Sequence, residues 1–248
     1  VWQDRPAPPR APVRPHPADL AGEAAGAKLQ RIREALSKAK LDALVVSDPH
    51  NLAWIFNLRG GDVAHTPLPL GYALVPRDGL PTLFLDPAKV TNEAGDALGG
   101  LADLAPPEAL APALRSLGEG GARVRIDQAT GAIALVRILE AAGGTADVGP
   151  DPVTLMKAVK NRAEIAGALA AHVRDGAAMV RFLAWLAREA AGGEVTEIAA
   201  VERLEAMRVA TGLLRDVSFP TISGSGPNGA VVHYRVTRRT DRRLAAGE

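Results

Sequence analysis

The sequence predicts an α/β fold built on a mixed sheet, followed after about residue 150 by an α+β region in which helices precede strands. Short β-branched runs alternate with helical segments over the first part, which is typical of helices packed on a mixed sheet. Beyond the Asp151-Pro152 breaker, three helical segments come in succession before the next strand-like runs. We therefore expect a proline-rich linker over 1–20, an α/β domain over 21–150 and the start of a second domain over 151–248.

In the first domain, the clearest helix signal lies between Glu23 and Lys40. Leu29, Ile32 and Leu36 recur there at three- and four-residue spacing among charged residues, which indicates an amphipathic helix. The run LDALVVS that follows is β-branched and ends at Asp48-Pro49, so it predicts a buried strand. The other elements expected are helices over 51–58, 88–98, 107–117 and 129–142, and strands over 70–75, 81–85, 122–127 and 145–148. Asp78-Gly79 favours a hairpin turn between the first two of these strands.

The second domain begins with Pro152 in the first turn of a helix over 154–160. A long helix is expected over 162–191, with its apolar face made by Ile165, Leu169, Val173, Val180, Leu183 and Leu186. Gly192-Gly193 ends this helix, and Thr196 is the expected N-cap of a third helix over 196–207. Strands are predicted over 217–223 and 229–234.

Composition and charge exclude several classes of protein. The 29 basic residues nearly balance the 28 acidic ones, so we expect neither nucleic acid nor a membrane surface as a partner. The chain lacks cysteine, which excludes disulfides, thiolate metal sites and cysteine nucleophiles. No apolar run is long enough to span a bilayer, and the first residues lack the apolar core of a signal peptide.

The ends of the sequence predict a piece of a longer protein. The chain starts without Met on Val1 and Trp2, and Leu244 to Glu248 resemble the approach to a strand. Residues 5–17 hold six prolines, which favour an extended connector from a preceding domain.

Several candidate sites have simpler structural explanations. Gly224 to Gly229 satisfy G-x-G-x-x-G, but the β-branched AVVHYRV follows where a dinucleotide site needs a helix. His172 and Asp175 share a helix face, where an ion pair or cap is favoured over a metal site. His50 and His65 are read as ordinary loop histidines, and Trp54 and Phe56 as core. The arginines at 235, 238, 239, 242 and 243 indicate a solvated hairpin tip, because Asp241 interrupts them and the chain is nearly neutral.

His233 is the remaining candidate. It is expected on a short strand, on one face with Val231 and Arg235, while Val232 and Tyr234 point the other way. A single histidine on a strand is more often structural than functional, so the spacing alone does not assign it a role.

Four segments resemble the creatinase/aminopeptidase family, whose catalytic domain has the pita-bread fold, and within it the three-domain Xaa-Pro aminopeptidases. The segments are VWQDRPAPP, DPHNLAWIFNLRGGDVAHTP, MKAVKNRAEIAGALAAHVRDGAAMVRFLAWL and SFPTISGSGPNGAVVHYRVT. Their order and spacing cover essentially the whole chain. The resemblance implies a creatinase N-terminal-like α/β domain with a mixed sheet, followed by the incomplete start of a pita-bread domain.

The resemblance also implies a chemistry. Such enzymes hold two divalent cations, usually manganese with zinc or cobalt as alternatives, through two Asp, one His and two Glu. They hydrolyse peptides that have proline at the second position. By resemblance, His233 lines the pocket as a catalytic and substrate-binding residue. The family's metal ligands follow the GE that closes this chain, so we expect no metal ligand, no bound metal and no peptidase activity in these 248 residues alone.

The parent protein is expected to be a cytoplasmic metalloaminopeptidase that forms a homodimer. Two alternatives stay open. One is another hydrolase on the creatinase fold, and the other is a non-catalytic family member that binds peptides or proteins.

Overall fold

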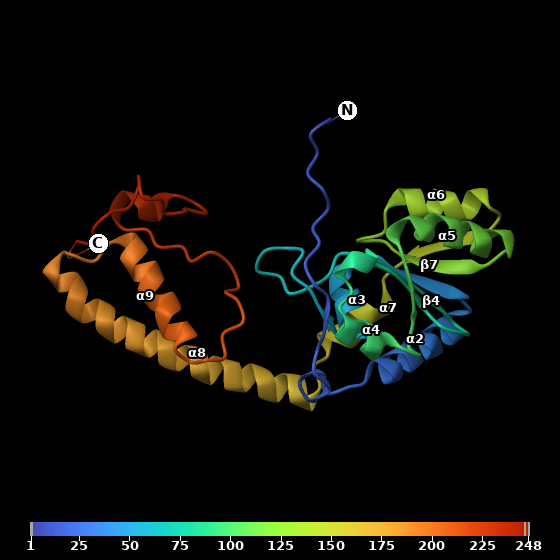
Figure 1. Ribbon diagram of the computed structural model, residues 1–248, viewed down its shortest axis with the longest axis horizontal. Helices are drawn as coiled ribbons and strands as arrows, with labels where there is room; N and C mark the ends of the chain where they lie inside the picture. The colour runs from blue at the N-terminus through green and yellow to red at the C-terminus, as the bar shows by residue number, and fades with distance from the viewer. Residues whose placement is uncertain (1, 246, 248) are drawn as a thin grey trace. The chain divides into compact units, whose positions relative to one another are not determined.

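The computed structural model describes residues 2–245 and 247, and the chain divides into two compact units, residues 1–165 and 166–248 (Figure 1). No helix in the part of the chain that is described has both the length and the apolar character needed to cross a membrane.

The first unit is built around a six-stranded mixed sheet. Its strands lie in the order β6-β5-β4-β2-β7-β8. Strand β4 pairs antiparallel with both β2 and β5, whereas the β2–β7, β7–β8 and β5–β6 pairs are parallel. The strands are β2 (Ala43–Val46), β4 (Tyr72–Pro76), β5 (Thr82–Phe84), β6 (Asp103–Ala105), β7 (Arg123–Asp127) and β8 (Thr145–Gly149).

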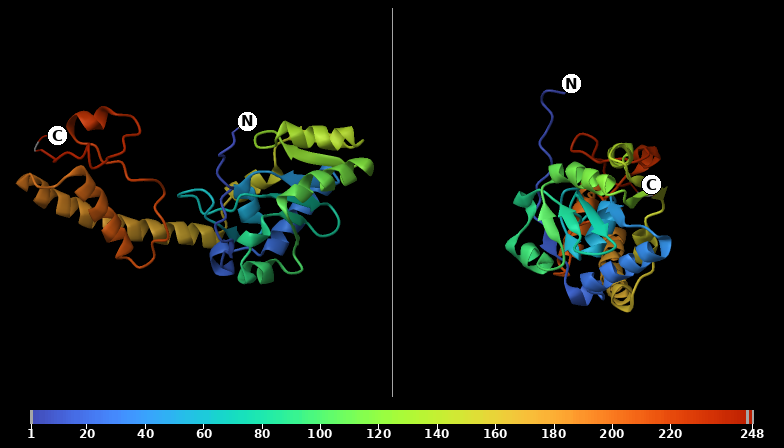
Figure 2. Two further views of the ribbon diagram at one scale, coloured as in Figure 1. Left: turned by 45° about the horizontal axis from the view of Figure 1, so that its top comes forward. Right: turned by 90° about the vertical axis from the view of Figure 1, so that its right-hand side faces the viewer.

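Helices cover both faces of this sheet, as Figures 1 and 2 show. Strand β2 explains why, because all four of its residues are buried. Leu44 and Val46 belong to one apolar core, and Ala43 and Val45 to the other, as the alternation of a strand requires. The first core is completed by α2 (Ala25–Ala39), α3 (Pro49–Ile55), α4 (Asn92–Leu98) and α7 (Pro152–Ala158), the second by α5 (Leu110–Glu119) and α6 (Ile133–Ala141).

Helices α3 and α7 begin in the same way. Asp48 and Asp151 are their N-caps, and each carboxylate accepts a hydrogen bond of 2.8 Å from the amide two residues later. The proline that follows each cap already has the backbone angle that the first helical residue needs. Asn51 joins the two helices, because its amide donates to Asp151 Oδ2 at 2.8 Å.

The predicted mixed α/β sheet and its principal helices are confirmed. The prediction missed short elements: β6, the helix α1 (Ala18–Ala21), and a two-stranded pair of β1 (Arg14–Pro15) with β3 (Leu58–Arg59). Single-turn 3-10 helices precede α4 and α5, at Pro87–Lys89 and Pro107–Ala109, where one longer helix was expected in each case.

The remaining helices belong to the second unit, except for residues 162–165 at the start of the long helix α8 (Arg162–Glu189), which belong to the first. Helix α8 continues into a 3-10 turn, Ala190–Gly192, and ends at Gly193 in the left-handed conformation. Helix α9 (Glu197–Val209) starts where it was predicted, with Thr196 Oγ1 accepting from the Ala199 amide at 3.1 Å. Most of the apolar face predicted for α8 is exposed, including Leu169, Val173 and Val180.

The two strands predicted over 217–223 and 229–234 are wrong. These residues form loops and one 3-10 helix, Gly226–Ala230. A strand is stable when its amides and carbonyls pair with a neighbouring strand, and the described residues of this unit offer no such partner. Pro227 and the surrounding glycines favour turns instead.

Candidate functional site

His233 lies on an exposed turn and not on a strand as predicted. Its φ of 55° is in the left-handed region, which histidine adopts more readily than most residues other than glycine. Val231, Val232 and Arg235 are exposed beside it, whereas Tyr234 is 7% exposed. The alternation expected of a strand is therefore absent, and one buried side chain directly follows the exposed imidazole.

The segment around His233 is tied to the first turn of α9 by Glu197. This carboxylate is fully buried, and it accepts from the Ser225 amide at 2.6 Å, from Asn228 Nδ2 at 3.0 Å and from the Tyr234 hydroxyl at 2.9 Å. The Arg242 amide completes the set at 3.3 Å. We call residues 225–242 the His233 loop. Its two ends and its middle thus meet at one carboxylate.

The ionisation of Glu197 is decided by these contacts. Burial raises the pKa of the carboxyl, but the hydrogen bonds from Ser225, Asn228, Tyr234 and Arg242 outweigh burial and hold the pKa below its ordinary value. Burial and the neighbouring Glu197 charge in turn raise the pKa of the Tyr234 hydroxyl, although a hydrogen bond to Thr240 opposes this. Glu197 is therefore an anion at neutral pH, and Tyr234 is the phenol that donates to it.

The other candidates in this unit have structural roles. Asp175 forms a two-bond ion pair with Arg208 of α9, with distances of 2.7 and 3.2 Å, and the His172 ring hydrogen-bonds the Ala168 carbonyl at 2.8 Å. The glycines of the G-x-G-x-x-G run lie in the 3-10 turn and its approach, and the described residues that follow form no helix. Of the basic run, Arg243 pairs with Glu194 at 3.0 Å.

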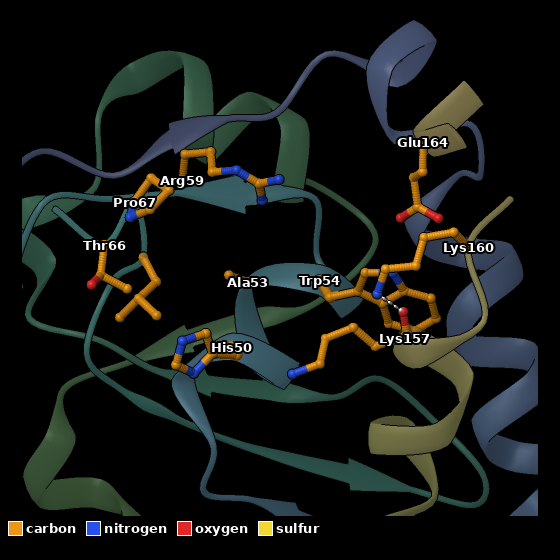
Figure 3. Close-up of a pocket in the computed structure, with 10 residues that line it drawn as sticks. His50, Ala53, Trp54, Arg59, Thr66, Pro67, Lys157, Lys160 and Glu164 are labelled. Atoms are coloured by element: carbon orange, nitrogen blue, oxygen red, sulfur yellow. Dashed lines mark hydrogen bonds between the residues drawn. The ribbon is translucent and has the colours of Figure 1, made fainter. Parts of the chain in front are cut away.

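A pocket of about 330 Å³ lies in the first unit, beside α3 (Figure 3). Ala53 and Trp54 contribute its apolar lining, Arg59 lies at one side, and His50 and Lys157 lie at the other. Each basic group already has a partner within the protein. His50 and Lys157 face Asp48 at 3.0 and 3.6 Å, Arg59 donates to the Leu58 carbonyl, and Lys160 donates to the Lys157 carbonyl.

The same contacts set the charge of Asp48. Burial opposes its ionisation, but hydrogen bonds from the amide and ring of His50 and the positive charge of Lys157 keep its pKa below the ordinary value. Because each basic group of the pocket already has a partner within the protein, we assign the pocket no ligand. His50 lies in the first turn of α3 and not in a loop as predicted, but its hydrogen bonds to Asp48 agree with the structural role expected for it.

His65 and Phe56 have separate surroundings. His65 lies in a loop with a φ of 60°, and Phe56 is a core residue, 3% exposed, as expected. Trp54 is only partly buried and packs on the first core.

Sequence reasoning missed the buried charged residues. Lys28, 1% exposed, donates to the Trp54 carbonyl at 2.9 Å and to Asn57 Oδ1 at 2.6 Å, and its ammonium lies 4.3 Å from the Trp54 ring centre. Glu197, which follows the Thr196 N-cap, was not singled out. A lysine or glutamate on a helix is usually solvated, and no local pattern distinguishes these two.

A dinuclear metal centre needs several Asp, Glu or His ligands close together. Among the described residues, no group of three or more His, Asp or Glu side chains is placed to hold a metal ion. The residues present therefore do not fit a dinuclear centre of the kind that the resemblance implies.

Comparison with protein families agrees with this architecture. Residues 4–164 match the model of the Creatinase/Prolidase N-terminal domain. The chain belongs to this family. Residues 166–248 match the model of metallopeptidase family M24, so the creatinase N-terminal domain is followed here by M24 sequence, as the resemblance predicted.

The chain is also similar in sequence to individual curated proteins. The chain is 38% identical over 251 residues to a probable Xaa-Pro aminopeptidase P from Aspergillus niger, covering 95% of this chain and 40% of the relative. It is 37% identical to the corresponding protein of Aspergillus clavatus, covering 95% of this chain and 37% of that relative. The chain thus spans about 40% of the length of the curated relatives it matches.

Solved structures show the same fold. An X-prolyl aminopeptidase from Caenorhabditis elegans, described as a cytosolic enzyme with a di-nuclear active site, matches with a TM-score of 0.90 and 27% identity. The match covers 99% of this chain and 41% of that one. A dipeptidase from Mycobacterium ulcerans matches with a TM-score of 0.63 and 23% identity, covering 90% of this chain and 58% of that one, a likeness of fold.

Proposed function

We propose that this creatinase-family chain is part of a metal-dependent Xaa-Pro aminopeptidase, which hydrolyses the N-terminal peptide bond before proline. The observation that carries the proposal is the similarity to an X-prolyl aminopeptidase over 99% of the chain with a TM-score of 0.90. The similarity to proteins named Xaa-Pro aminopeptidase P supports it in sequence.

His233 is proposed as the substrate-side and catalytic residue of this chain. Its exposure, beside an anchored tyrosine, supports the proposal because an imidazole must reach substrate while its backbone stays fixed. In this role the ring donates a hydrogen bond to the oxygen that becomes negative as the carbonyl is attacked.

The whole protein is proposed to use two divalent ions, with manganese first and zinc or cobalt as alternatives. The di-nuclear site in the description of the Caenorhabditis elegans enzyme supports the number. The described residues of this chain do not form such a donor set, so we derive no catalytic step through the metals here.

The proposal also covers the substrates, the assembly, the cellular location and the domain bounds. The substrates are peptides with proline at the second position, the assembly is a homodimer and the location is the cytoplasm, as for the relative described as cytosolic. We keep 1–20 as linker, 21–150 as the creatinase N-terminal-like domain and 151–248 as the beginning of the pita-bread domain as proposed bounds, although Val13 and Val153 both lie in the core of the first unit.

The test uses the whole protein and a matched pair of peptides, one with proline and one with alanine at the second position. We expect release of the first amino acid from the proline peptide only, loss of that release with a chelator, and recovery with Mn²⁺. Hydrolysis of creatine or of dipeptides alone would favour another creatinase-fold hydrolase. Peptide binding without hydrolysis under all metal conditions would favour the non-catalytic alternative.

A further inference from the structure

One buried polar network in the described part of the second unit has no role in the proposed chemistry so far. It is centred on Glu197, whose side chain is fully buried at the start of α9. The carboxylate receives hydrogen bonds from two backbone amides, one side-chain amide and one hydroxyl. The Glu197 amide also donates to the Arg242 carbonyl at 2.9 Å, so backbone and side chain hold the same partner.

The residues that donate to Glu197 lie on both sides of His233 in the sequence. Ser225 and Asn228 lie before it, Tyr234 follows it directly, and Arg242 closes the loop. The network also has a second layer, in which Asn228 Nδ2 donates to the Tyr234 hydroxyl at 2.9 Å and Tyr234 contacts Thr240 Oγ1 at 3.1 Å. The position of Tyr234, and with it the position of the neighbouring His233, therefore depends on the carboxylate.

The backbone at His233 needs this support. Its left-handed φ of 55° is less favourable than ordinary backbone for a residue with a side chain, so surrounding contacts help to hold it. The Tyr234 amide donates to the Val231 carbonyl at 3.2 Å, which closes a tight turn around Val232 and His233. Because the loop has no strand partner in the described part of the unit, the loop is tied to α9 by the contacts to Glu197 and by the Ile198 amide, which donates to Asp241 Oδ1 at 3.0 Å.

We propose that Glu197 is a positioning residue for His233, because its buried carboxylate gathers both sides of the His233 loop and so presents the exposed imidazole to the substrate. This inference rests on the proposed aminopeptidase function. Its physical basis is that a buried anion leaves its donors unsatisfied when it is removed, and a connected network loosens as a whole.

The first test measures amide hydrogen exchange in the 248-residue chain itself. We compare Glu197→Gln with Glu202→Gln, a substitution at an exposed position of the same helix. We expect exchange at the Ser225 and Tyr234 amides, which donate to Glu197 and to the Val231 carbonyl, to become at least about tenfold faster in Glu197→Gln and to stay unchanged in Glu202→Gln. Unchanged exchange in Glu197→Gln would overturn the inference whatever the enzyme's activity. If this variant does not fold, Tyr234→Phe removes one bond to the carboxylate and keeps the ring, and it should accelerate exchange to a smaller extent.

The second test is a double-mutant cycle in the whole enzyme. We expect Glu197→Gln to lower kcat for a Xaa-Pro peptide by about tenfold or more with KM within about twofold, because orientation at the transition state is lost. In a His233→Asn background the same substitution should have little further effect, since the residue that it positions is gone. If Glu197→Gln lowered kcat equally in both backgrounds, Glu197 would affect catalysis by some means other than positioning His233. An inactive wild-type enzyme would contradict the proposed function, and the exchange test would still decide the role of Glu197.

Discussion

Asp62 and Lys89 form an ion pair whose side chains are almost entirely buried, 0% and 3% exposed. The Asp62 carboxylate also accepts from the Ala11 amide at 3.1 Å and from the Leu70 amide at 2.7 Å. Lys89 donates in addition to the Leu70 carbonyl at 2.9 Å. One buried pair thus joins the N-terminal segment, the loop before β4 and the turn before α4.

Breaking this pair from one side should be costly. We expect Lys89→Met to lower the free energy of unfolding by about 3–5 kcal/mol, because the Asp62 charge stays buried without its partner. The double variant Asp62→Asn/Lys89→Met should lose less, since it buries no charge. The free energy of unfolding is measured by urea denaturation, with circular dichroism as the signal. As a control, Arg10→Met removes the exposed partner of Asp86 and should cost less than about 1 kcal/mol. If Lys89→Met and Arg10→Met lowered the free energy of unfolding equally, the buried pair would not have the larger effect on stability that we expect.

Lys28 should give the first unit a stability that rises with pH. Burial lowers the pKa of Lys28 from 10.5 to about 8, against the attraction of Glu23 and Glu164. Between these two values the unfolded chain binds a proton that the folded chain does not, so the free energy of unfolding increases with pH. The contribution is about 1.4 kcal/mol per pH unit and about 3 kcal/mol in all. Below about pH 8 both states are protonated and the slope disappears.

The check compares the free energy of unfolding at about pH 7.5 and about pH 9.5 in the original chain and in Lys28→Met. We expect the substitution to remove about 2 kcal/mol of the pH-dependent difference. Lys38→Met, at an exposed position of the same helix, should leave the difference unchanged. A Lys28→Met variant with the original pH dependence would show that Lys28 is not the group that titrates.

His233→Asn in the whole enzyme tests the proposed substrate-side role with little disturbance of the fold. Asparagine tolerates the left-handed backbone found at this position, and the side chain is exposed. We expect kcat for a Xaa-Pro peptide to fall about 10²- to 10³-fold, the usual loss when one transition-state hydrogen bond is removed. The control is His172→Asn, on the exposed surface of α8. An enzyme that keeps full activity without His233 would exclude the role.

The 248-residue chain should not bind two Mn²⁺ ions tightly by itself. The described residues form no group of three or more His, Asp or Glu ligands. Manganese needs several oxygen or imidazole ligands at once, so we expect no two-site binding at micromolar concentration. Isothermal titration calorimetry measures this directly, and EDTA-treated whole protein is the positive control. Two-site micromolar binding to the chain alone would contradict the expectation.

Much of the first unit could be predicted because its signals are local. The spacing of Leu29, Ile32 and Leu36 indicated α2, and all three are buried in the structure. The run Ala43–Val46 indicated a buried strand and is the strand shared by both cores. Strand β6 was missed because it has three residues and its central Leu104 is exposed, which leaves little periodicity to detect.

The second unit shows where such reasoning fails. AVVHYRV has the β-branched composition of a strand, but composition indicates only that a segment fits a half-buried sheet. Without a neighbouring strand among the described residues, the segment forms turns. Glu197 could not be identified either, because its burial is produced by Ser225, Asn228 and Tyr234, all distant in the sequence. His233 was found through a resemblance and not through its spacing.

The proline-rich start of the chain has a consequence for shortened versions of the protein. Val13 is fully buried, its amide donates to the Lys89 carbonyl at 2.7 Å, and its carbonyl accepts from Thr91 Oγ1 at 2.9 Å. Arg14 and Pro15 then pair with β3. An expression boundary chosen by proline content, at residue 21, would therefore delete a core side chain and one strand of a pair. A boundary before Ala11 would retain both.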